Sequence, residues 1–142
     1  YKLAVYYNEL RDLSKVKFYL NNCVDLNPNH AKAYRDLGYM YFNNSQLDKS
    51  RLNLEKAINL DYSDSKSHFY LAQVMVRMND LHDAEQHFLC SLDINPKLVE
   101  SMVEIALLRL GVKDIEGAIN FYLKAKNNSL NIHHPDLEQI IK

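Results

Sequence analysis

The sequence contains few residues of the kinds that make tight turns or disulfide bonds. It has three glycines and three prolines in 142 residues. A protein of many β-strands needs a turn about every 8–12 residues, so this scarcity excludes such a fold and predicts a mostly helical chain. The two cysteines, Cys23 and Cys90, are too few for the disulfide framework of a small secreted module. We expect both to be buried free thiols.

Charge of one sign and long apolar runs are also lacking. Seventeen basic and eighteen acidic residues leave a formal net charge of −1, and nucleic-acid binding needs a concentrated basic excess. We therefore expect no nucleic-acid partner. No apolar run approaches the roughly 20 residues of a membrane-spanning helix, so no direct membrane insertion is expected. The chain starts at Tyr1 without a signal peptide, which we interpret as a fragment of a longer protein. A cytoplasmic location fits, as does a periplasmic one if that protein carries a signal or anchor elsewhere.

The residue patterns of enzyme active sites are missing as well. There is no phosphate-binding glycine loop, no G-x-S-x-G, no H-E-x-x-H and no C-x-x-C, and each of these would supply a defined chemistry. Asp83 and His87 lie one helical turn apart, but no third metal ligand is fixed. We therefore predict no catalytic site, no metal site and no cofactor, and a protein that is not an enzyme.

The sequence aligns with itself, without a gap, at a shift of 34 residues. A self-similarity of this period indicates a repeat architecture, and it divides the chain into repeats at 1–30, 31–64, 65–98 and 99–132. The columns in register include Leu3, Leu37, Leu71 and Ile105; Leu13, Leu47, Leu81 and Ile115; Leu20, Leu54, Phe88 and Tyr122; and the small residues Ala4, Gly38, Ala72 and Ala106.

The spacing of apolar residues within each repeat predicts two helices of roughly 14 residues. Small residues are expected where the paired helices cross, because they let the backbones approach. Asp12, Asp80 and Asp114 precede the second helices and are expected to cap them. The last segment, 135–142, is expected to be a capping helix, since Pro135 suits the first helical turn. The alternative is that this segment starts a further repeat.

The repeats resemble those of the tetratricopeptide repeat family, whose pattern is W-x2-L-G-x2-Y, then A-x3-F, then a proline. The resemblance covers about residues 1–132, and Leu130 stands where the fourth repeat would have its proline. It implies an all-α, right-handed solenoid of helical hairpins in which 1–142 form a single domain.

The abundance of Lys and Asn suggests a bacterial source. The second and third repeats carry the pattern most clearly, with Tyr34, Leu37, Gly38, Tyr41, Leu54 and Ala57, and with His68, Leu71, Ala72, Met75, Ala84, Phe88, Ser91 and Pro96. His68 stands in place of the large aromatic and is expected to be a packed core residue.

In this family the concave face is lined by the first helix of each repeat. Carried over by register, the resemblance implies a largely apolar, partly basic groove, and a contiguous apolar surface of this kind marks a binding site. The predicted groove residues are Tyr1, Val5, Lys32, Arg35, Tyr39, Phe42, Lys66, Phe69, Gln73, Val76, Arg77, Val103, Leu107 and Leu110.

One ligand class of the family can be examined directly. Chaperone-binding members hold a C-terminal carboxylate with a clamp of Lys, Asn and Arg at five positions. In this chain those positions read Tyr1, Val5, Asp36, Lys66 and Tyr70, or, one repeat later, Arg35, Tyr39, Tyr70, Glu100 and Glu104. Neither set has enough donors, and the acidic residues would repel a carboxylate. We expect no chaperone tail as a partner.

Three functions are compatible with these observations. The leading hypothesis is a protein-interaction module, a scaffold or adaptor whose groove binds a helix or extended segment of a partner. The alternative is that a segment of the parent protein fills the groove. The second hypothesis is an assembly or self-association domain of a larger envelope or organelle complex, which would make the chain a homo-oligomer. The third is a regulatory repeat array of a larger enzyme.

Overall fold

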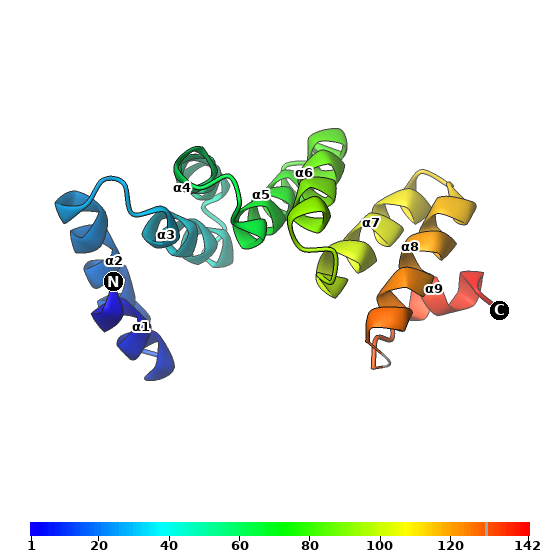
Figure 1. The fold of residues 1–142 in the computed structure, drawn as a ribbon, viewed down its shortest axis with the longest axis horizontal. Coiled ribbons are helices and arrows are strands. Elements are labelled where there is room, and N and C mark those ends of the chain that lie inside the picture. Colours follow the sequence, from blue (N-terminus) through cyan, green and yellow to red (C-terminus); the bar gives the residue numbers. More distant parts are fainter. Residues whose placement is uncertain (130) are drawn as a thin grey trace.

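The computed structural model describes residues 1–129 and 131–142. Leu130, the counterpart of the repeat's proline, lies outside the described residues. Within the described ranges every regular element is a helix, as predicted, and the helices follow one another along a curved row (Figure 1). They are α1 (Lys2–Glu9), α2 (Leu13–Leu26), α3 (Ala31–Asn43), α4 (Leu47–Leu60), α5 (Ser65–Arg77), α6 (Leu81–Ile94), α7 (Val99–Gly111), α8 (Ile115–Asn128) and α9 (Pro135–Ile140).

The first eight helices form four hairpins, α1–α2, α3–α4, α5–α6 and α7–α8, whose members contact each other along their length. Each hairpin turns through one residue with a positive φ: Arg11 at 57°, Ser45 at 57°, Asn79 at 64° and Lys113 at 63°. Successive members of this set are 34 residues apart. This backbone region is unfavourable for residues with a Cβ atom, Asn being the best tolerated of the four. The four hairpin turns therefore have the same backbone geometry, although Arg11, Ser45 and Lys113 are not residue types that favour it.

The residue after each turn lies at the N-cap of the second helix. The Asp12 carboxylate accepts a hydrogen bond from the Lys15 N–H at 3.2 Å, and that of Asp114 accepts one from the Gly117 N–H at 2.9 Å. Asp80 occupies the same position, but its side chain makes no capping bond. The predicted caps are therefore confirmed for Asp12 and Asp114 and wrong for Asp80.

The core is a series of clusters in which each hairpin packs against the next. In the middle of the chain, Leu54 and Ile58 of α4 pack against Leu71 and Val74 of α5. The residues at the register of Leu71 are almost fully buried: Leu37 is 2% exposed, Leu71 1% and Ile105 0%. Each of these three side chains is covered by the second helix of the preceding hairpin.

The crossing of α3 and α4 is especially close. Gly38 is buried, and a Cβ atom built on it would lie 2.5 Å from the Cγ atom of Leu54. Ser50 of α4 donates its hydroxyl to the Gly38 carbonyl at 2.7 Å. Two small residues thus bring the helices together, as the repeat pattern predicted.

Helix α9 lies against α7 and α8 at the C-terminal end of the row (Figure 1). Leu137 is fully buried and packs with Ala106 and Tyr122. A single oxygen of Glu138, Oε1, accepts hydrogen bonds from the Tyr122 hydroxyl at 2.6 Å and from Lys126 Nζ at 2.7 Å. These interactions lower the pKa of Glu138 to about 2.

The cysteines and His68 can be compared with their expected burial. His68 is 1% exposed, which confirms a core position. Cys23 and Cys90 are free, but both are only partly buried, so the expectation of buried thiols is wrong. The Sγ atom of Cys90 lies 3.7 Å from the Tyr62 hydroxyl.

The described part of the chain contains no helix that is both long and apolar enough to span a bilayer.

Candidate binding site

The inner side of the first three hairpins contains a hollow of about 250 Å³. Four of the predicted groove residues line it: Val5 from α1, Arg35 and Tyr39 from α3, and Lys66 from α5. The first hairpin contributes mainly small and apolar residues to the lining, and α3 and α5 contribute the rest. The other lining residues are Ala4, Asn8, Val16, Leu20, Asp36, Met40 and Tyr70.

Two aromatic rings form one wall of this hollow. Tyr39 and Tyr70 are stacked, with ring centroids 4.7 Å apart and planes 30° apart. Tyr39 is 41% exposed, and Val5, on the facing helix, is 42% exposed. An aromatic surface fixed by stacking offers apolar contact at little cost in side-chain entropy.

The arginine of the hollow is paired within the chain. Arg35 contacts Asp36 at 2.9 Å and Asp64 at 3.2 Å. Burial opposes the charged form of Arg35, but the two carboxylates raise its pKa. Tyr1 donates its hydroxyl to Asp36 at 2.7 Å, and burial together with this bond raises the pKa of Tyr1 to about 12. The network ties α1, α3 and the start of α5 together.

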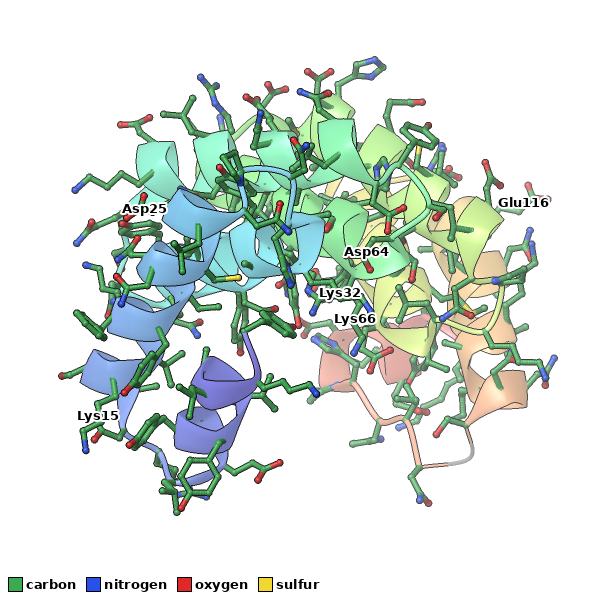
Figure 2. The ribbon with its side chains drawn as sticks, turned by 60° about the vertical axis from the view of Figure 1, so that its left-hand side comes forward. Lys15, Asp25, Lys32, Asp64, Lys66 and Glu116 are labelled. Carbon is green, nitrogen blue, oxygen red and sulfur yellow. The ribbon has the colours of Figure 1, made fainter. Side chains whose placement is uncertain are left out.

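Lysines supply the remaining positive charge of this region. Lys32 and Lys66 are both exposed, and they lie with Asp64 towards the middle of Figure 2, whereas Lys15 and Glu116 lie at its edges. The predicted basic character of the groove therefore rests on Lys32 and Lys66 rather than on the arginines.

The second predicted groove arginine, Arg77, also contacts its own chain. Its guanidinium donates to the Phe42 carbonyl at 3.1 Å and to the Ser45 hydroxyl at 3.0 Å, and it lies 4.9 Å from the centroid of the Phe42 ring. Arg77 thus joins the end of α5 to the turn between α3 and α4.

The remaining apolar residues of the predicted groove are partly buried against the core. They pack against the clusters of the second, third and fourth hairpins, and they do not line the hollow, which is formed by α1, α2, α3 and α5. These side chains therefore contribute to the core. They are Phe42, Phe69, Val76, Val103, Leu107 and Leu110.

Gln73, the last predicted groove residue, is partly buried and hydrogen-bonds the side chain of Glu104 on α7. Burial nevertheless raises the pKa of Glu104 overall. Gln73 therefore joins the third and fourth hairpins.

A histidine pair between α5 and α6, in which His68 is buried and His87 is partly buried, was not predicted. The Nδ1 atoms of His68 and His87 are 3.2 Å apart, and His68 Nε2 lies 3.1 Å from the Tyr62 carbonyl. His68 must donate from Nε2 to this carbonyl, so its Nδ1 accepts the proton of His87 Nδ1. His68 is neutral in this arrangement, and burial of both rings disfavours their protonated forms. The two residues are 19 positions apart, and only the crossing of α5 and α6 brings them together.

The pair should make the stability of the protein dependent on pH. Burial lowers the pKa of His68, and burial and the neighbouring His68 lower that of His87. An unfolded histidine takes up its proton near pH 6.5, so stability is complete above this pH. The free energy of unfolding should decrease as pH falls through about 6.5 towards the lower pKa values of the folded pair. Denaturant unfolding at a series of pH values measures this.

Replacement of His68 by phenylalanine should reduce this pH dependence, since the pair no longer forms. Replacement of His82 by asparagine is the matched control, because His82 is an exposed histidine of the same helix as His87. Equal pH dependence in the wild type and the His68→Phe variant would contradict the assignment.

Among the residues with described positions, no three or more His, Cys, Asp or Glu side chains cluster closely enough to hold a metal ion.

Comparison with known proteins agrees with the hairpin geometry. Two tetratricopeptide repeat models match residues 1–30 and 19–51. The solved structure of MamA superposes with a TM-score of 0.82 at 22% identity, over 89% of this chain and 74% of that one. The chain therefore has the fold of solved tetratricopeptide repeat domains. The first such domain of Spaghetti (RPAP3), solved with an HSP90 peptide, superposes with a TM-score of 0.74 at 17% identity, over 78% of this chain and 90% of that one.

Two curated proteins are similar to this chain in sequence. Anaphase-promoting complex subunit 3 of Schizosaccharomyces pombe is 25% identical over 123 residues, which are 87% of this chain and 18% of that protein. Heat shock protein STI1 of Saccharomyces cerevisiae is 31% identical over 97 residues, 68% of this chain and 16% of that protein. The chain thus spans less than a fifth of each relative. Both are yeast proteins, so the bacterial origin stays a prediction.

Proposed function

We propose that this repeat domain is a protein-interaction module that binds a segment of a partner protein in the hollow formed by α1, α2, α3 and α5. The observation that carries the proposal is the pair of exposed apolar side chains that line the hollow, Val5 from α1 and Tyr39 from α3, with the Tyr39 ring stacked on that of Tyr70. A hollow lined by apolar and aromatic side chains with a few polar groups is the usual form of a binding site.

The charged side chains around the hollow indicate which kind of partner segment would bind there. Arg35, Asp36 and Asp64 satisfy one another, so a ligand carboxylate finds no unpaired arginine. Lys66 lies at the edge of the hollow and is exposed. The segment that fits best inserts an apolar or aromatic side chain between Val5 and Tyr39 and places an acidic group near Lys66. An apolar site of this size supports affinities on the order of micromolar, because association costs about 4–15 kcal/mol.

The comparisons support a binding role of this general kind. The RPAP3 domain was solved with a bound HSP90 peptide, and one curated relative is a subunit of a larger complex. This chain lacks the carboxylate clamp, so we propose an internal segment of a partner rather than a chain terminus.

The proposal can be tested by selecting phage-displayed random dodecapeptides on the full chain. Peptides enriched on the wild type should lose at least tenfold in affinity for a Val5→Ser/Tyr39→Ser variant, because the apolar wall is removed. A Leu52→Ser variant is the matched control, since Leu52 is 62% exposed on α4 and does not line the hollow. Unchanged binding to the double variant, with helicity preserved in circular dichroism, would refute the proposal.

A further inference from the structure

A second hollow, of about 280 Å³, lies between α4, α5 and α6, and it shares no lining residue with the hollow described above. Its lining residues are Glu55, Ile58 and Asn59 of α4, Leu71 and Met75 of α5, and His87 of α6. Glu55 is the charged residue among them, and its carboxylate is paired with Arg51 at 3.6 Å. The second hollow is thus partly apolar with its charge balanced, which suits an uncharged ligand.

The repeat register indicates what is missing at this place. Met75 and His87 occupy two positions that the other repeats fill with at least one six-membered aromatic ring. The corresponding pairs are Tyr7 and Tyr19, Tyr41 and Asn53, and Arg109 and Phe121. In the first repeat the two rings are stacked, with centroids 5.3 Å apart, and the rings of the second and fourth repeats pack against core clusters. The third repeat has no such ring, and the second hollow is lined by both residues that replace it.

His87 gives the second hollow a hydrogen-bond acceptor. Its Nδ1 donates to the Nδ1 of His68, because His68 Nε2 donates to the Tyr62 carbonyl. The Nε2 atom of neutral His87 therefore carries a lone pair and no proton. This atom has no hydrogen-bond partner among the described residues and is not enclosed by them. Burial lowers the pKa of His87, which keeps the acceptor form at neutral pH.

We propose that the second hollow binds an aromatic ring that carries a hydrogen-bond donor, the chemistry of a phenol, supplied by a tyrosine of a partner protein or by a free phenol. The ring would fill the space that the other repeats fill with their own rings. It would contact the sulfur of Met75, since thioether sulfur and aromatic rings attract each other, and its hydroxyl would donate to His87 Nε2. This site does not depend on the proposed binding of a partner segment in the hollow of α1, α2, α3 and α5.

The test uses the full chain with ¹³C-labelled methionine methyl groups, and p-cresol, which has the ring and hydroxyl of tyrosine. Met75 lines the second hollow and Met40 lines the first, so their methyl resonances report on the two sites separately. The Met75 resonance should move saturably with p-cresol, with half-saturation on the order of 1 mM for so small a ligand. 4-Methylanisole, in which the hydroxyl is methylated, should bind at least threefold more weakly because it cannot donate to His87.

A variant fills the second hollow from within. Met75→Tyr introduces the residue that the second repeat carries as Tyr41 and should abolish p-cresol binding, followed here by the ring ¹⁵N resonances of His87. Met78→Tyr is the matched control and should retain binding, because Met78 is 36% exposed and does not line the second hollow. The comparison of p-cresol with 4-methylanisole needs no variant, so it decides the question even where Met75→Tyr fails to fold.

A blocked tripeptide, acetyl-Gly-Tyr-Gly-amide, distinguishes the two sources of the phenol. Tighter binding than that of p-cresol identifies a tyrosine of a partner protein, and weaker binding identifies a free phenol. Three results would overturn the proposal: no saturable shift of the Met75 resonance, equal affinities of p-cresol and 4-methylanisole, and undiminished binding of p-cresol to a folded Met75→Tyr variant.

Discussion

Replacing Leu137 with aspartate is expected to lower the free energy of unfolding of the C-terminal hairpin by about 3–5 kcal/mol. Leu137 is 0% exposed and packs with Ala106 and Tyr122. The change removes a buried leucine side chain and places an unpaired charge among apolar atoms. Both effects are unfavourable, and the adjacent carboxylate of Glu138 adds repulsion.

The effect should be local. In a repeat protein each unit contacts only its neighbours, so α7, α8 and α9 should lose protection from hydrogen exchange while α1–α4 keep theirs. Hydrogen–deuterium exchange resolved by mass spectrometry measures both ends at once. Gln139→Asp is the control, because Gln139 is an exposed residue of the same helix and should change stability by less than about 0.5 kcal/mol. Uniform loss of protection along the chain would contradict this expectation.

Replacing Gly38 with alanine is expected to destabilise the protein by about 1–2 kcal/mol. The new Cβ atom would lie 2.5 Å from Leu54 Cγ and 2.9 Å from Leu54 Cδ2. Overpacking of this kind costs about 1–3 kcal/mol, and the better helix propensity of alanine returns about 1 kcal/mol of it at most. The Ser50 hydrogen bond to the Gly38 carbonyl would also be strained, since the two helices must separate.

Gly111 provides the matched control for this change. It is the last residue of α7, and a Cβ atom built on it has no neighbouring atom within 4 Å. Gly111→Ala should therefore be neutral or slightly stabilising, by a few tenths of a kcal/mol. Thermal and denaturant unfolding of the two variants decide the question, and equal effects would show that the close approach of α3 and α4 is not what constrains position 38.

The helices and their pairing could be predicted from the sequence because they depend on local spacing. The 34-residue register correctly predicts burial of Leu37, Leu71 and Ile105. It fails for Leu3, which has the same register and is 53% exposed. Burial there depends on a neighbouring helix, and α1 has none on that side among the described residues. A repeat sequence predicts which side of a helix is apolar but not whether another element covers it.

The site was predicted less well because its contacts join different repeats. Arg35 meets Asp64, 29 residues away, and Arg77 meets the Phe42 carbonyl, 35 residues away. No local spacing indicates these pairs, so the sequence predicts both arginines as ligand-facing charges. The left-handed residues of the turns were missed for another reason. Of the four, only Asn79 is of a type that favours this conformation, so Arg11 and Lys113 gave no signal.

The ion pairs that Arg35 makes within the chain affect the rate at which a partner associates with the hollow. Arg35 is balanced by Asp36 and Asp64, and Lys32 and Lys66 leave only a weak surplus of positive charge nearby. A surface with so small a field does not steer an approaching molecule, and salt screens what little attraction there is. The association rate constant of a partner should therefore be that of unsteered diffusion and should change little with salt concentration. Selectivity between partners would then arise from differences in their dissociation rate constants.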